Sequence, residues 1–337
     1  MDMEKFIKNM PKVELHAHLN GSLSTKTLLE LATLEYGETN NEFQTICRNF
    51  QQNQEFSLDE CFKKFPIAHA LTTTKDGLRR ALLSVIRDFS QDNVVYLELR
   101  TTPKSTTKMS KVEYLETVLE TIRLADSLYP DICVKLLPSI DRSKGIEMAK
   151  ETMSIVTEAM KTQSDLIKGI DLSGNPAISS FDEYGKILSD AKNNNLKLAL
   201  HCAEIDNSDE TYKMLQFGMD RCGHGTFITS QNLNIAKEKQ IPIECCLTSN
   251  LKCGTVKSYV EHHFKNLYQS NHPVVLCTDD PGVFDTTLSD EFIIAQKTFN
   301  LSTKDLELLS LKAVDVSFAD SVEKEFIKQK ISKYFND

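Results

Sequence analysis

Short apolar runs rich in Val, Ile and Leu recur along the chain, and longer stretches of mixed polarity separate them. Runs of this kind are typical of strands in a parallel sheet, because such strands are buried on both faces. There are eight of them, at residues 13–18, 94–100, 132–140, 167–172, 196–202, 219–223, 241–247 and 274–278. The pattern therefore predicts eight buried strands.

The stretches between these runs carry apolar residues three to four positions apart, the spacing of one helix face. They lie at residues 78–89, 112–128, 146–160, 183–193 and 209–217. Another helix is predicted from residue 58 to residue 70, because Ser57-Leu58-Asp59-Glu60 is a capping-box sequence. The polar segment 36–55 predicts an insertion after the first strand, and the chain beyond residue 288 is predicted to be helical.

Strands that alternate with helices favour a parallel sheet with right-handed crossovers. Eight strands in one chain favour closure into a (β/α)8 TIM barrel over an open doubly wound sheet. We therefore predict an α/β fold of this type, with extra helices after strand one and at the C-terminus. The chain has no repeat and no Gly-, Pro- or Ser-rich linker, so residues 1–337 are expected to form a single domain.

The composition and charge of the chain indicate the kind of binding partner and the cellular compartment. A net charge of −9 argues against a nucleic-acid partner, although a few local cations can serve a small anionic ligand. No run reaches the ~20 apolar residues of a membrane span. The nine cysteines form no C-x-x-C pair, and the first residues lack the apolar run of a signal peptide. We expect a cytoplasmic protein with reduced thiols, located in the cytosol, and a barrel large enough to be a monomer.

Histidines stand at the ends of two predicted strands. His16 and His18 end the first strand, and they project to one face because strand residues two apart do so. At the carboxyl end of a barrel strand that face points to the active-site mouth. His201 stands in the same position on the fifth strand. An H-x-H pair is common by chance, so the pair alone leaves metal binding and a structural role open.

Two further polar residues follow the fifth and sixth strands. Glu204 lies three residues after His201, so it could reach over a metal without binding it and act as an acid/base group. A surface glutamate is the alternative. His224 stands between Gly223 and Gly225, which leaves its ring room near a ligand, although a buried packing histidine is also compatible with this sequence.

The adjacent carboxylates of Asp279 and Asp280 follow the eighth strand and need counter-charge, which a metal supplies. A turn or a helix cap is the alternative for Asp-Pro-Gly. All these strand ends meet on one barrel face, and three imidazoles with one carboxylate suit zinc and leave a position for water. Zinc lowers the pKa of that water toward neutrality. These residues predict one Zn²⁺ per chain, bound by three of the four histidines and by at least one of the two aspartates.

Two other zinc-hydrolase classes do not fit the chain. The cytidine-type deaminases use H-x-E with P-C-x-x-C, and metalloproteases use H-E-x-x-H; neither pattern occurs. Instead, PKVELHAHLNGS, DLSGNP, LALHCAE, RCGHGT and LCTDDPGVF occur in this order. With these motifs, from Pro11 to about Asp290, the chain resembles the adenosine/AMP deaminase family of metal-dependent hydrolases.

The resemblance implies hydrolysis at carbon 6 of a purine, with the zinc bound by His16, His18, His201 and Asp279. Glu204 would protonate ring nitrogen 1, and His224 would orient the attacking hydroxide and stabilise its charge. Asp280 would bond nitrogen 7, and the Gly174 backbone N–H would bond nitrogen 3. His18 would also contact substrate.

One position departs from the adenosine deaminases. Their first motif has an aspartate that binds the sugar 5′-hydroxyl, whereas this chain has Asn20. A carboxylate there would repel a 5′-phosphate, and an amide can donate to it. The motif is similar to that of the N6-methyl-AMP deaminase branch. That similarity implies nucleotide contacts from His69, Thr101, Thr102, Pro103, Lys104 and Asp141. His69 could instead be an ordinary helix residue and Lys104 a solvated charge; Arg100 and Arg142 remain open as phosphate partners.

The resemblance thus favours a zinc-dependent hydrolase of N6-methyl-AMP and other N6-substituted purine nucleoside monophosphates, giving IMP and an alkylamine. Adenosine deaminase acting on the free nucleoside is the first alternative. AMP deaminase is another, although those enzymes have extended N-terminal regions. A non-catalytic binding protein on the same scaffold is the alternative from a different class; such a protein would normally have lost a ligand or the acid/base residue.

Overall fold

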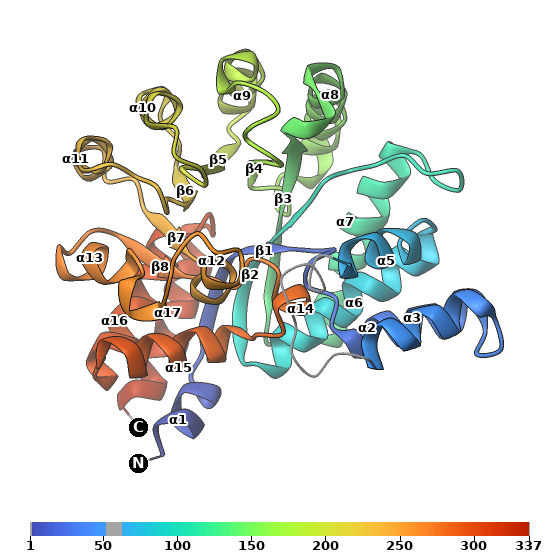
Figure 1. Cartoon of the computed structure of the whole chain (residues 1–337), viewed down its shortest axis with the longest axis horizontal. Helices are drawn as coiled ribbons and strands as arrows, with labels where there is room; N and C mark the ends of the chain where they lie inside the picture. The colour runs from blue at the N-terminus through green and yellow to red at the C-terminus, as the bar shows by residue number, and fades with distance from the viewer. Residues whose placement is uncertain (1, 52–62, 337) are drawn as a thin grey trace.

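Eight parallel strands form the centre of the protein, and each lies beside the next in chain order (Figure 1). The structure, a computed structural model, describes residues 2–51 and 63–336. The strands are β1 (Lys12–His18), β2 (Val94–Thr101), β3 (Cys133–Asp141), β4 (Gly169–Ser173), β5 (Lys197–Cys202), β6 (Arg221–His224), β7 (Ile243–Cys245) and β8 (Val274–Leu276).

The barrel closes between β1 and the residues that follow β8. The backbone N–H of His18 donates to the carbonyl oxygen of Asp279 at 2.9 Å, and the N–H of Asp279 donates to that of His16 at 2.7 Å. The predicted eight-stranded (β/α)8 barrel is therefore confirmed. The same two hydrogen bonds place three predicted metal ligands side by side on the seam.

Helices surround the strands and connect most of them (Figure 1). The predicted crossover helices are confirmed by α6 (Lys75–Gln91), α7 (Lys111–Leu128), α8 (Ile146–Gln163), α9 (Gly185–Asn193) and α10 (Ser208–Phe217). Two more connecting helices are α11 (Ser230–Glu238) and α13 (Phe264–Gln269). Their buried faces carry the apolar residues whose spacing predicts them, such as Leu78, Leu82 and Val85 of α6.

Extra helices lie where the sequence predicts them. After β1 come α2 (Thr25–Tyr36), α3 (Asn41–Gln51) and α5 (Lys64–Leu71). The chain ends with α15 (Leu288–Phe299), α16 (Thr303–Val316) and α17 (Ser321–Asn336), and α1 (Met3–Asn9) precedes the barrel. The capping-box sequence 57–60 lies outside the described residues, and α5 is the described part of that predicted helix.

The predicted seventh strand, residues 241–247, is too long. Only Ile243–Cys245 form β7, and α12 (Leu247–Lys252) begins where the strand is expected to end. A short helix, α14 (Pro281–Phe284), likewise follows β8. Cys246 and Leu247 are fully buried, and a continuous apolar run does not distinguish a buried strand from a buried helix. The error matters because α12 lies over the site.

Charged side chains fill part of the barrel interior, where branched apolar residues are usual. Arg221 pairs with Glu98 and, at 2.7 Å, with Glu244, and all three are fully buried. Arg100 also bonds Glu244 at 2.6 Å. Removing one partner of a buried ion pair costs about 3–5 kcal/mol, because the other charge stays buried. Glu244 of this network also bonds His16, so the network connects directly to a predicted metal ligand.

None of the described helices is long and apolar enough to cross a membrane.

Candidate active site

The carboxyl ends of the strands surround a cavity of about 1020 Å³. Its lining includes every residue predicted to bind substrate except Pro103, namely His18, Asn20, His69, Thr101, Thr102, Lys104, Asp141, Gly174 and Asp280. The predicted acid/base pair, Glu204 and His224, lines the same cavity. Residues far apart in the sequence thus meet at one place, as the strand-end positions predict.

The four predicted metal ligands converge at the base of this cavity. The Nε2 atom of His201 lies 3.2 Å from that of His16 and 3.3 Å from that of His18. Oδ1 of Asp279 lies 3.4 Å from Nε2 of His16 and 3.5 Å from Nε2 of His18. Ligand atoms this close together can bind a single metal ion that prefers tetrahedral coordination.

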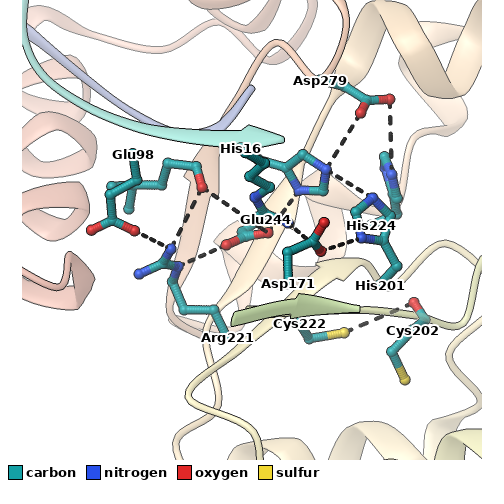
Figure 2. Close-up of polar contacts among 12 residues, drawn as sticks. His16, Glu98, Asp171, His201, Cys202, Arg221, Cys222, His224, Glu244 and Asp279 are labelled. Carbon is teal, nitrogen blue, oxygen red and sulfur yellow. Dashed lines mark hydrogen bonds and ion pairs between the residues drawn. The ribbon is translucent and has the colours of Figure 1, made fainter. Parts of the chain in front are cut away.

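Buried carboxylates hold two of the imidazoles from behind (Figure 2). Nδ1 of His16 donates to Glu244 at 2.7 Å, and Nδ1 of His201 donates to Asp171 at 2.8 Å. These bonds place the proton on Nδ1 and leave the Nε2 lone pair facing the cluster. Two facing lone pairs 3.2 Å apart repel each other, and either a proton on one Nε2 or a metal ion between them relieves this repulsion. The donor set therefore fits a bound metal ion.

The electrostatics of the cluster also favour a cation. Burial and Arg100 lower the pKa of His16, but Glu244 and Asp279 outweigh them and raise it to about 9. Burial would raise the pKa of Asp279, yet His224, His16 and His18 hold it well below its ordinary value. A carboxylate that stays ionised among imidazoles is a competent metal ligand. Ser249 donates to its other oxygen, Oδ2, at 2.7 Å and fixes its orientation.

Glu204 and His224 lie on the cavity side of the cluster. Nε2 of His224 is 4.0 Å from Oε1 of Glu204 and 3.9 Å from Oδ2 of Asp279. Burial raises the pKa of Glu204, and the charge of Asp279 adds to the rise, so the carboxyl retains a proton at higher pH than usual. Burial lowers the pKa of His224 well below its ordinary value, so that imidazole is neutral. The site thus places a carboxyl with a raised pKa beside a neutral imidazole.

The backbone is strained where these side chains enter the cavity. His224 and Asp279 have φ of 67° and 65°, values that are uncommon for residues other than glycine. Strain of this kind persists only where surrounding contacts hold it, and it clusters at functional sites.

Asp280 stands at the cavity wall with its Oδ1 buried and, among the described residues, without a hydrogen-bond partner. Burial, and then the neighbouring charge of Asp279, raise its pKa well above the ordinary value. Gly21 makes room for this carboxyl, since a Cβ at that position would lie 1.6 Å from Oδ1. An unpartnered carboxyl with a raised pKa at a cavity wall is suited to donate to a ligand acceptor.

Gly174 lies against Asp141 on the opposite wall. Its φ is +86°, and a Cβ there would lie 2.1 Å from Oδ1 of Asp141. Both the conformation and the contact require glycine.

A cationic corner lies at the other end of the cavity. Nζ of Lys104 is 2.9 Å from Nδ1 of His69 and donates to Thr72 at 3.2 Å. The amide of Asn20 donates to the same hydroxyl at 3.1 Å. Burial, Lys104 and Lys144 lower the pKa of His69 to about 4. No ion pair to Lys104 is found among the described residues, so an anion bound in this corner would complete the arrangement.

The comparisons with known proteins agree with this geometry. The sequence profile described as Adenosine deaminase matches residues 11–334. The chain belongs to the adenosine deaminase family. It is 48% identical over 332 residues to the adenosine deaminase-like protein of Drosophila melanogaster, covering 98% of both chains. It is 39% identical over 334 residues to the N6-methyl-AMP deaminase of Homo sapiens, covering 96% of this chain and 93% of that protein.

Solved structures of the family share the whole fold. The apo structure of the N6-methyl-AMP deaminase from Arabidopsis thaliana has a TM-score of 0.90 at 39% identity, over 98% of both chains. The crystal structure of the Arabidopsis ADAL protein complexed with IMP has a TM-score of 0.89 at 38% identity, over 98% of this chain and 99% of that one. As a member of this family, the present protein is a hydrolytic deaminase, and its His and Asp cluster can hold a metal ion. Ligand atoms of His16, His201, His224 and Asp279 all lie within 4.8 Å of one another, and His18 forms a similar group with Asp171 and His201.

The structure also shows the hydrogen-bond and ion-pair partners of several side chains of this deaminase whose availability to the substrate the sequence does not reveal. Arg100 is fully buried among carboxylates, and Arg142 pairs with Glu210 at 2.9 Å, so neither guanidinium is available to a phosphate. The hydroxyl of Thr101 pairs with that of Tyr114 at 2.7 Å, behind the strand.

Four functional candidates escape the sequence patterns: Thr72, Lys144, Ser249 and Asn250. The last two lie on α12, just beyond the segment predicted as the seventh strand. Thr72 follows α5 and has no motif of its own, but its position three residues after His69 is a signal that could have found it.

Proposed function

We propose that this deaminase hydrolyses N6-methyl-AMP and other N6-substituted purine nucleoside monophosphates to IMP and an alkylamine. The observation that carries the proposal is the neutral Asn20 amide in the same corner as Lys104, Thr72 and His69. An aspartate there would repel a phosphate and pair with Lys104 instead. The names of the relatives, and the IMP held by a similar Arabidopsis structure, support the same substrate class.

The metal ligands would be His16, His18, His201 and Asp279, and the ion would be one zinc per chain. Three nitrogens with one carboxylate oxygen are a set that zinc prefers. When bound, zinc lowers the pKa of water toward neutrality and supplies a hydroxide nucleophile. Asp171 and Glu244 would orient the imidazoles and strengthen them as ligands.

Three side chains would then manage the purine ring and the attacking oxygen. Glu204, whose pKa burial raises, would donate its proton to ring nitrogen 1 and so make carbon 6 more electrophilic. His224 would donate from Nε2 to the attacking oxygen. Asp280 would donate to nitrogen 7 from the carboxyl that lacks a partner among the described residues.

The remaining contacts would fix the purine and the sugar phosphate. The backbone N–H of Gly174 would donate to nitrogen 3 and His18 would pack against the base, while Asp141 would accept from the ribose hydroxyls. The phosphate would lie at Lys104 and the hydroxyls of the Thr101–Thr102 segment, next to Pro103. The hydroxyl of Thr101 is already bonded to Tyr114 of α7. Among the described residues, the hydroxyl of Thr102 has no such bond, so Thr102 is the better phosphate partner of the two.

Exchanging Asn20 for aspartate tests the proposal. Asn20→Asp should lower kcat/KM for N6-methyl-AMP by about 100-fold, since a charge pair in a partly buried site is worth about 3 kcal/mol. Turnover of N6-methyladenosine should not fall with it. The matched control is Asn175→Asp, which adds the same charge on the exposed rim of the same cavity and should leave the nucleotide-to-nucleoside ratio within about threefold. An unchanged ratio in Asn20→Asp would remove Asn20 from phosphate recognition.

A further inference from the structure

A chain of hydrogen bonds leads away from the cavity behind His224. Nδ1 of His224 lies 3.4 Å from the side-chain amide nitrogen of Asn250. The amide oxygen of Asn250 lies 3.0 Å from Nε2 of His262. Nδ1 of His262 in turn lies 3.0 Å from the backbone nitrogen of Phe264. Asn250 and His262 are almost completely buried, so water does not compete for these bonds.

The direction of this chain follows from its last member. A backbone N–H is only a donor, so Nδ1 of His262 is the acceptor and its proton is on Nε2. That proton is donated to the oxygen of Asn250, which turns the NH₂ group toward His224. Nδ1 of His224 therefore accepts. A neutral imidazole that accepts at Nδ1 carries its proton on Nε2, the atom that faces Glu204 and Asp279.

The neutral state of His262 is needed for this direction, because an imidazolium would present a second N–H to the N–H of Phe264. Burial, with the neighbouring His263 and His224, lowers the pKa of His262 to about 2 and keeps the ring neutral. His263, the next residue in the chain, also contacts His224. Nε2 of His263 donates to the carbonyl oxygen of His224 at 2.7 Å, and so holds the backbone that has φ of 67°. The rings of His262 and His263 are stacked, with centroids 4.3 Å apart.

We propose that Asn250 and His262 are positioning residues that hold His224 in the tautomer with its proton on Nε2, so that His224 is a hydrogen-bond donor to the nucleophilic oxygen. This inference rests on the role of His224 in the proposed function. It adds that His224 does not meet the nucleophile as a proton acceptor: its only lone pair on a ring nitrogen is at Nδ1 and is bonded to Asn250. The wrong tautomer of a catalytic histidine is costly in another enzyme, where it lowers kcat by about 10⁴-fold.

The first test reads the tautomer directly. In the zinc-loaded enzyme with ¹⁵N-labelled histidine, long-range ¹H–¹⁵N spectra at pH 8 separate protonated from unprotonated ring nitrogens. His224 should have a bare Nδ1 and a protonated Nε2, and His262 should have the same pattern. A protonated Nδ1 on neutral wild-type His224 would overturn the proposal without any variant.

The second test reverses the donor. Asn250→Asp offers His224 only acceptor atoms and is almost isosteric, so Nδ1 of His224 should gain a proton and kcat should fall by about 100-fold. Zinc content should stay at one per chain and KM should change by less than about threefold, because the substrate contacts remain. A bare Nδ1 in Asn250→Asp would contradict the proposal.

The third test separates hydrogen bonding from packing at His262. His262→Gln keeps a donor that can reach the oxygen of Asn250, whereas His262→Leu has a similar volume and no donor. We expect kcat about 10-fold lower in His262→Leu and largely recovered in His262→Gln. The control is His272→Gln, at a buried histidine that donates to the carbonyl oxygen of Ile241 below the barrel and should leave the His224 spectrum unchanged.

Equal kcat in the two His262 variants would overturn the role of His262. The proposed substrate is a separate question, since the spectra need no substrate and the kinetics can use whichever purine the wild-type enzyme converts fastest.

Discussion

Glu204 is the side chain whose surroundings make it an acid, because burial raises its pKa and it faces the cavity beside His224. Glu204→Gln keeps the shape and removes the proton that, in the proposed function, passes to ring nitrogen 1 in the transition state. We predict that kcat falls by about 10²–10⁴-fold while nucleotide binding, measured by calorimetry with IMP, changes little. A near-normal kcat in Glu204→Gln would take Glu204 out of this role.

Lys104 should give nucleotide binding a pH dependence. Burial lowers its pKa to about 8, so the ammonium loses its charge as the pH rises through that value. A nucleotide phosphate is already a dianion there, its second pKa being about 6. We predict that KM for N6-methyl-AMP rises about 10-fold between pH 7 and pH 9.5, while KM for N6-methyladenosine stays flat.

Lys104→Arg is the matched variant for that profile, because a guanidinium stays charged throughout this range. The rise in KM should disappear in Lys104→Arg. If nucleotide and nucleoside profiles rise in parallel in the wild-type enzyme, the phosphate does not bind at Lys104.

The sequence predicts some of the candidate site residues well and others poorly. The predicted metal ligands and acid/base pair carry their signal in short motifs at strand ends, and the structure brings all of them together. Thr72 and Asn250 carry no such signal. Their placement depends on how α5 and α12 pack over the barrel mouth, and the only local pattern that points to it is the three-residue spacing of Thr72 from His69.

The short helix α12 carries both Ser249 and Asn250, and Glu291 of α15 holds its first turn. Oε2 of Glu291 accepts from the backbone N–H of Thr248 at 3.2 Å, and Oε1 accepts from Thr286 at 3.0 Å. Glu291→Ala leaves both donors buried without a partner, so we predict a free energy of unfolding lower by about 3 kcal/mol in urea titrations.

Glu291→Gln is the control, since its amide oxygen can still accept one of these bonds. Its loss of stability should be smaller than that of Glu291→Ala. An Ala variant within about 0.5 kcal/mol of the wild type would mean that α12 does not depend on this carboxylate.

The element order follows well from the hydrophobic pattern. Each of the eight predicted strands overlaps an observed one, because buried parallel strands are bounded by polar loops that the sequence records. The error at α12 has a physical cause: inside a barrel, strand and helix can be equally apolar, and only their packing differs.

The whole barrel closes at the proposed metal ligands, because the backbones of His16 and His18 of β1 bond that of Asp279 after β8. A bound ion would join these segments to His201 of β5. Chelation of the metal should therefore lower Tm by several degrees, and zinc at about 1,000 times its dissociation constant should restore about 4 kcal/mol of stability.

Asp279→Ala should abolish that dependence on zinc, and Glu204→Gln, which keeps all four ligands, should retain it. An identical Tm with and without chelator in the wild-type enzyme would argue that these four residues do not hold a metal in the folded protein.

The most direct test of the proposed function compares four substrates on the zinc-loaded enzyme: adenosine, AMP, N6-methyladenosine and N6-methyl-AMP. The cationic corner around Lys104 and Asn20 predicts that each nucleotide is converted with higher kcat/KM than its nucleoside, and that N6-methyl-AMP is converted best. A kcat/KM for adenosine above that of both nucleotides would contradict it.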